Sequence, residues 1–75
     1  MARESIIQYL LRVLREHATD GVLEGENLRR AIGVIMQEKG LHYGLIRYWM
    51  ESLEKGGLIR METEGKSIVR VTLLP

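Results

Sequence analysis

The sequence contains no cysteine and no phenylalanine, and it has one tryptophan and one proline. Without cysteine, disulfide bonds and thiolate zinc sites are excluded, and the composition suits a reducing compartment. Without phenylalanine, the core has to be built mainly from aliphatic side chains and methionine. Hydrophobic residues make up 45% of the chain, which is typical of a folded domain rather than a disordered segment.

Long apolar runs are also missing. No stretch approaches the roughly 20 residues that cross a bilayer. Gln8, Arg12 and Arg15 interrupt the apolar residues near the start of the chain, which argues against a secretory signal. We therefore expect a cytoplasmic protein without membrane contact. A length of 75 residues predicts a single domain, residues 1–75, with a small core that a second subunit would supplement.

The chain has no large excess of either charge. It carries 11 basic and 10 acidic side chains, a net charge of +1, whereas proteins that coat DNA without sequence preference are more basic. The total charge therefore counts somewhat against nucleic acid, and the distribution of the charges has to decide.

Catalytic patterns are absent from the sequence. There is no glycine-rich phosphate loop and no Gly-x-Ser-x-Gly segment, and none of the serines has an evident base partner. His17 and His42 lie far apart in the sequence with no cysteine beside them, so we expect no metal site and no cofactor. One small domain also leaves little room for a substrate pocket. We predict that the protein is not an enzyme and has no small-molecule substrate.

The spacing of the apolar residues predicts the order of secondary structure. A helical period indicates helices at about 5–17, 24–39 and 42–55. Val22 and Leu23 can form a very short strand after the first helix. Alternation over 58–62 and 68–73 indicates two strands, with 63–67 as the hairpin loop.

Two of these helices raise questions that the sequence leaves open. The apolar residues of the first helix cover an arc of roughly 200°, wider than the ~100° stripe of an ordinary surface helix. Either two helices and a sheet cover this arc within the domain, or part of it is the contact surface of a homodimer. In the second helix, Leu28, Ala31, Ile32, Ile35 and Met36 form the expected buried stripe. Gly33 lies on its exposed side and costs about 1 kcal/mol relative to alanine.

The segment 41–59 resembles the recognition helix and wing entry of winged helix-turn-helix transcription regulators. Apolar residues follow the spacing of those proteins and end in their Leu-Glu-x-x-Gly-Leu-Ile pattern. The matching residues are Leu41, Ile46, Met50, Leu53, Glu54, Gly57, Leu58 and Ile59. The resemblance extends over nearly the whole chain but does not single out a subfamily. It implies an α+β fold, a small winged helix in which a three-helix bundle is followed by a C-terminal β-hairpin wing.

The same resemblance implies sequence-specific binding of double-stranded DNA, with the third helix in the major groove. The residues at its base-reading positions are His42, Tyr43, Gly44, Arg47 and Tyr48. Arg47 can bond the O6 and N7 atoms of guanine together, or it can simply pair with Glu51 one turn later. Tyr48 lies on the exposed face, where an aromatic ring suits a sugar–phosphate contact or a protein partner.

Contacts to DNA phosphates are expected from basic side chains around this helix. The candidates are Arg29, Arg30, Lys55 and Lys66. Glu62 and Glu64 flank the hairpin loop and would repel phosphates, so either Lys66 alone touches DNA or the wing stays off it. The alternative function is a protein-interaction adaptor with the same fold, which the nearly neutral charge and Tyr48 would suit.

Overall fold

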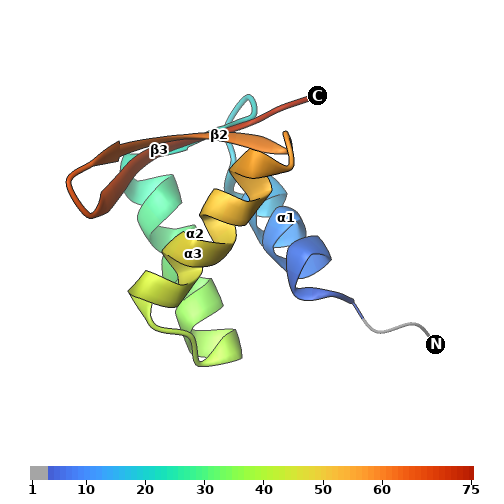
Figure 1. Cartoon of the computed structure of the whole chain (residues 1–75), viewed down its shortest axis with the longest axis vertical. Helices are drawn as coiled ribbons and strands as arrows, with labels where there is room; N and C mark the ends of the chain where they lie inside the picture. Colours follow the sequence, from blue (N-terminus) through green and yellow to red (C-terminus); the bar gives the residue numbers. More distant parts are fainter. Residues whose placement is uncertain (1–3) are drawn as a thin grey trace.

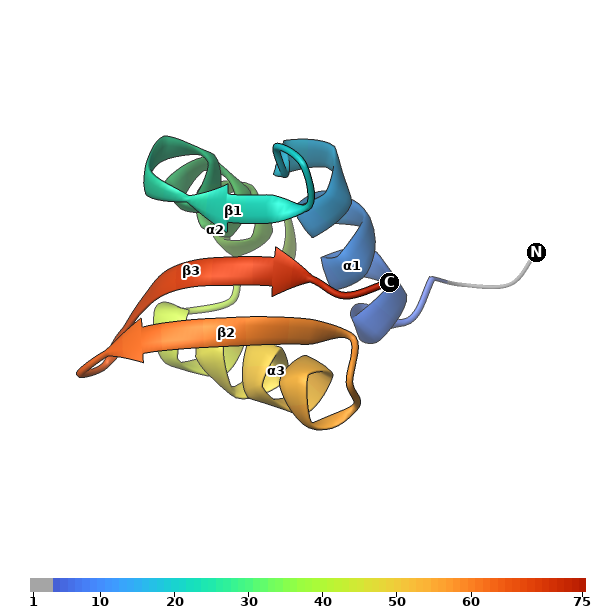
Figure 2. The same ribbon diagram turned by 90° about the horizontal axis from the view of Figure 1, so that it is seen from above.

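The computed structural model describes residues 4–75 and contains three helices and three strands. They are α1 (Ile6–His17), β1 (Val22–Glu24), α2 (Gly25–Lys39), α3 (Tyr43–Lys55), β2 (Ile59–Glu64) and β3 (Ser67–Leu73). The strands form one antiparallel sheet in the order β1-β3-β2. Figure 1 shows all three helices on the same side of this sheet, and in Figure 2, where the sheet faces the viewer, β1 crosses in front of α2 and β2 runs along α3. The α+β winged-helix arrangement predicted from the sequence is confirmed.

The core between the helices and the sheet is aliphatic, as the lack of phenylalanine requires. Its largest fully buried side chains are Leu10, Val13, Leu14, Leu23, Ile35, Ile46, Met50, Leu53, Ile59 and Val71. They come from all six elements, so each helix and strand contributes to one continuous cluster. Burial of such a side chain stabilises the fold by roughly 1.5–3 kcal/mol.

Helix α1 begins at a capping box. The Ser5 hydroxyl accepts a hydrogen bond from the Gln8 N–H at 3.1 Å, and the Gln8 side chain accepts one from the Ser5 N–H at 3.0 Å. These bonds satisfy two backbone donors at the helix start. One flank of the helix packs on α2 through Tyr9, whose hydroxyl donates to Glu38 at 2.6 Å and whose ring lies 4.5 Å from the Lys39 ammonium. Much of the wide apolar arc is therefore covered within the domain.

Helix α2 runs without a break through Gly33 and ends where Gly40 adopts a left-handed conformation, with φ of 64°. Leu28, Ala31, Ile32 and Ile35 are buried as expected. The prediction for Met36 was wrong, because its side chain is 40% exposed. Met36 lies one turn beyond Ile32 at the edge of the stripe, where the helix borders an open groove instead of the core.

The hairpin is longer and its turn tighter than the alternation predicted. Only Gly65 and Lys66 lie between the strands, and Gly65 has a φ of 61° that suits this turn. Thr63 pairs with Ile68 and Glu62 with Arg70, so Val69 has no partner on β2. This extra residue is a β-bulge. It shifts the alternation by one position and lets Ile68 and Val71, three residues apart, both face the core.

The outer face of the sheet carries a row of charges. Arg70 lies between Glu24 of β1 and Glu62 of β2 in the strand register. Its Nε is 2.8 Å from a Glu24 carboxylate oxygen, and its Nη1 is 3.7 Å from a Glu62 oxygen. Cross-strand pairs of opposite charge stabilise a sheet modestly, and this row leaves the open face polar.

Candidate nucleic-acid interface

Helix α3 has a buried face and an exposed face. The side chains buried in the core are Ile46, Met50 and Leu53. Tyr48 lies on the opposite face and is 59% exposed. Gly44, one turn earlier, and Lys55, two turns later, are exposed on the same side. This exposed row is the part of α3 that the core leaves uncovered.

The N-terminal end of α3 is capped by His42. Its Nδ1 accepts a hydrogen bond from the Leu45 N–H at 3.2 Å, which satisfies one of the backbone donors that a helix leaves free in its first turn. The imidazole lies against Gly44, where an added Cβ would come within 3.3 Å of two ring atoms. Glycine at this position therefore leaves room for the capping ring. Two predicted base-reading residues thus also have a structural function.

Tyr43, one turn before Arg47, and Glu54, two turns after it, both contact the hairpin. Arg47 lies on the same flank of α3, between the exposed row and the hairpin. Its side chain is 28% exposed, and its Nε is 3.3 Å from Glu51 Oε1. The contact is an ion pair without a hydrogen bond, because the buried Nε has no hydrogen-bond partner. The pairing expected as the alternative to base recognition is present. Such a pair contributes only ~0.3–0.5 kcal/mol, less than the ~1–3 kcal/mol of a bidentate contact to guanine.

Tyr48 and Trp49 form an aromatic pair at the surface. Their ring centroids are 5.5 Å apart at an interplanar angle of 74°, the edge-to-face geometry that aromatic rings favour. Trp49 is half-buried and packs against the core. The Tyr48 ring is thereby held in place while most of it stays open to a partner.

Two hydrogen bonds attach the hairpin to α3. The Tyr43 hydroxyl accepts the Ile68 N–H at 2.7 Å, close to the hairpin turn. The Glu54 carboxylate accepts the Met61 N–H at 2.9 Å. Because β2 is an edge strand, the second bond also occupies a backbone donor that would otherwise invite pairing with another chain. The orientation of the wing relative to α3 is set at both ends of the helix.

These two hydrogen bonds were not predicted from the sequence, which offered Tyr43 either as a base-reading residue or as a packed side chain at the edge of the apolar stripe, and Glu54 only as part of a pattern. The Leu-Glu-x-x-Gly-Leu-Ile pattern was a usable signal for Glu54, since the glutamate and the strand entry are close in sequence. No sequence signal marks the Tyr43 contact, because Ile68 lies 25 residues away.

The four predicted phosphate contacts differ in their surroundings. Arg30 pairs with Glu26 at 2.8 Å on the surface of α2. Arg29, Lys55 and Lys66 form no ion pair with any residue of the described part of the chain. Because exposed ion pairs contribute little, pairing does not remove Arg30 from consideration, but the three unpaired cations are the better candidates.

The structure places these cations at different points of the surface. Arg29 lines one groove with Tyr43 and Ser67, and Ser67 follows Lys66 of the hairpin turn. Helix α2, the start of α3 and the wing tip therefore meet at this point. Lys55 lies at the opposite end of α3, roughly 18 Å away along the axis at 1.5 Å per residue.

The acidic character of the wing is partly balanced. Glu62 is 3.7 Å from the Arg70 guanidinium on the outer sheet face. Glu64 has no such neighbour among residues 4–75 and lies directly before the turn that carries Lys66. The charge at the wing tip is therefore close to neutral, and Lys66 remains the side chain there that suits a phosphate.

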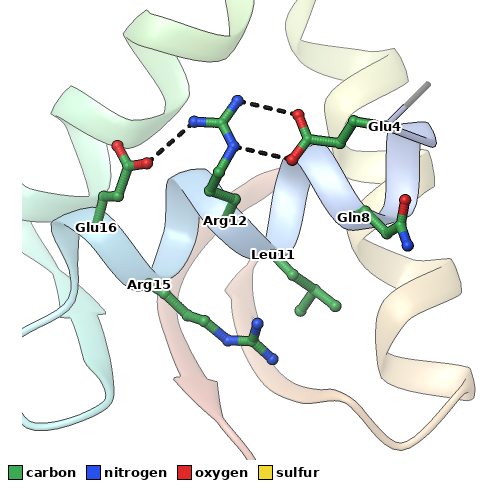
Figure 3. A pocket seen from close by; sticks show the side chains of 6 residues that line it. All are labelled: Glu4, Gln8, Leu11, Arg12, Arg15 and Glu16. Carbon is green, nitrogen blue, oxygen red and sulfur yellow. Dashed lines mark hydrogen bonds and ion pairs between the residues drawn. The ribbon is translucent and has the colours of Figure 1, made fainter. Parts of the chain in front are cut away.

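One exposed face of α1, the helix whose apolar arc was predicted to form a homodimer contact, carries a cluster of charged groups. Figure 3 shows Arg12 between two carboxylates, with Leu11 pointing away from it. The Arg12 guanidinium binds Glu4 through two hydrogen bonds of 2.9 and 3.0 Å and Glu16 through one of 3.0 Å. The hydrogen bond from Arg12 lowers the pKa of the Glu4 carboxyl. Leu11 is half-buried, and a homodimer through α1 stays a prediction.

Within residues 4–75, no group of three or more His, Cys, Asp or Glu side chains is placed to hold a metal ion. None of the helices in that part of the chain has the length and apolar character needed to cross a membrane. Comparison of the chain with protein families, with curated proteins and with solved structures found no match.

Proposed function

We propose that this chain binds double-stranded DNA with α3 in the major groove and acts as a sequence-specific transcription regulator. The observation that carries the proposal is the exposed row of α3, from Gly44 through Tyr48 to Lys55, on a helix whose other sides are held by the core and the hairpin. An α-helix of this kind fits the major groove of B-DNA. Rigid attachment matters, because base recognition requires side chains in defined positions.

The distribution of charge supports this proposal more than the total does. Arg47 flanks the exposed row, and the unpaired cations Arg29 and Lys66 lie near the start of the same helix. Phosphate contacts position a protein on DNA and base contacts confer sequence specificity. We assign the first role to Arg29, Lys55 and Lys66 and the second to Arg47.

A second candidate function is that of a protein-interaction adaptor. The observation that favours it is the Tyr48–Trp49 pair, which presents a supported aromatic ring that is 59% exposed. Aromatic residues held in this way are frequent at the centres of protein interfaces. Tyr48 serves either function, so a test has to rest on Arg47 and on salt dependence.

The test is a binding titration with duplex DNA at several salt concentrations, after selection of a preferred sequence from a random pool. We expect the affinity for DNA to fall as the salt concentration rises. In Lys66→Ala, the slope of the logarithm of the binding constant against the logarithm of the salt concentration should be smaller by about 1. Arg47→Ala should lose ~1–3 kcal/mol on the selected sequence and little on others. Glu51→Gln, which removes a negative charge beside Arg47, should strengthen binding.

Arg15→Ala is the control, because it also removes one arginine, but from α1 instead of α3. It should bind DNA as the unmodified protein does. Equal losses for Arg47→Ala and Arg15→Ala would contradict base recognition by α3. A lack of duplex binding even at low salt would favour the adaptor function.

A further inference from the structure

A groove lies outside the exposed row of α3. Helix α2, the first residue of α3 and the start of β3 border this open groove, which has a volume of about 610 Å³. Its apolar lining comes from Leu28, Ile32, Met36 and Ile68. The volume lies within the roughly 300–1,000 Å³ range of small-molecule sites.

The polar groups that line this groove are all hydrogen-bond donors of neutral or positive charge. Arg29 has no ion-pair partner within residues 4–75. The Tyr43 oxygen accepts the Ile68 N–H, so its own proton is free to be donated. The Ser67 hydroxyl is the third polar group, and no carboxylate is among the lining residues. The groove thus combines an apolar floor with a positive, donor-rich rim.

Gly33 lines this groove without a side chain. A Cβ added there would have no atom within 4 Å, although the residue lies in the middle of α2 and lines the groove. Met36 lines it as well and is 40% exposed. A methionine side chain is flexible and polarisable and adapts to irregular apolar ligands.

We propose that this groove binds a small organic anion, an apolar molecule with one carboxylate, whose body contacts Ile32, Met36 and Ile68 and whose carboxylate pairs with Arg29. Charge complementarity and the apolar floor together define this ligand class. A phosphodiester would satisfy the donors but leave the apolar floor uncovered. The inference does not depend on DNA binding, because the site is tested without DNA.

A second hollow, on α1, differs from the groove in the charges that line it. It has the same volume of about 610 Å³, but its lining includes Glu4 and Glu16 as well as Arg12 and Arg15. Arg12 is already engaged by both carboxylates. An added anion would meet two negative charges there, so that hollow does not share the selectivity proposed for the groove.

The experiment is a titration of the 15N-labelled protein followed by amide NMR shifts. The probes are decanoate, decanol, decyltrimethylammonium and inorganic phosphate, each below its aggregation concentration. We expect saturable shifts at Gly33, Met36, Ser67 and Ile68 with decanoate, and binding weaker by about tenfold or more for the other three probes. Equal binding of decyltrimethylammonium, or equal binding of inorganic phosphate, would overturn the proposal.

Two variants and a control locate the site. Gly33→Leu fills the groove without meeting a neighbour at Cβ and should abolish the decanoate shifts while the helix stays folded. Arg29→Gln should weaken decanoate binding about tenfold and leave decanol binding unchanged. Arg15→Gln, on α1, should bind decanoate as the unmodified protein does. Unchanged decanoate binding by a folded Gly33→Leu or by Arg29→Gln would refute the assignment.

Discussion

The hydrogen bond between Tyr43 and the wing can be removed with a change of one atom. In Tyr43→Phe the ring stays in place, but the oxygen that accepts the Ile68 N–H at 2.7 Å is lost. Ile68 is only 6% exposed, so water replaces the lost partner poorly. A buried donor left without a partner costs about 1–3 kcal/mol, and the partly buried position of this bond favours the lower part of that range. A loss of about 1 kcal/mol lowers the Tm of a domain of this size by roughly 4–8 °C.

Tyr48→Phe is the matched control for this prediction. It removes the same atom from the same helix, but from a side chain that is 59% exposed. Its free energy of unfolding should stay within about 0.5 kcal/mol of the unmodified protein. Urea unfolding measures both variants, and hydrogen exchange of the Ile68 amide should accelerate only in Tyr43→Phe. Equal stability of the two variants would refute the view that this bond holds the wing to α3.

Three further perturbations test other parts of the fold. Gly33→Ala should raise the free energy of unfolding by about 1 kcal/mol, because the added methyl group meets open space; thermal unfolding at an unchanged or lower Tm would contradict this. Ser5→Ala removes the hydroxyl that caps the Gln8 N–H. It should lower the free energy of unfolding by about 1 kcal/mol, which urea unfolding will detect. Burial and the hydrogen bond to Glu38 raise the pKa of Tyr9 from 10.0 to about 12. The neutral phenol is therefore favoured in the folded state, and its contribution to stability is present below pH ~10 and lost as the pH rises towards ~12. In Tyr9→Phe the loss of stability at alkaline pH should be smaller than in the unmodified protein. An identical decline of stability with pH in both proteins would argue against Tyr9 as its source.

The order of the elements and the approximate ends of the helices were accessible from sequence because short-range chemistry determines them. The Ser5 cap and the glycines at 40 and 65 mark helix and turn boundaries through local hydrogen bonds and permitted backbone conformations. The apolar period then distinguished helices from strands. Each of these signals acts within a few residues, and for that reason a single sequence contains it.

Features that depend on contacts between distant segments were not accessible. The bulge at Val69 is determined by the need to bury both Ile68 and Val71 against the helices. Strict alternation places those two residues on opposite faces. Met36 was assigned to the core because its helical position is next to Ile32, and only the position of the hairpin shows that the groove begins there.

The structural roles of the proposed base-reading residues were not predicted from the sequence. Of the five proposed base-reading residues, His42 caps α3, Gly44 accommodates the capping ring and Tyr43 holds the wing. Arg47 and Tyr48 neither cap the helix nor attach the wing. Under the proposed function, direct recognition by one chain is then limited to the few bases that two side chains reach. Further specificity would have to come from DNA shape or from a second copy bound to an adjacent half-site.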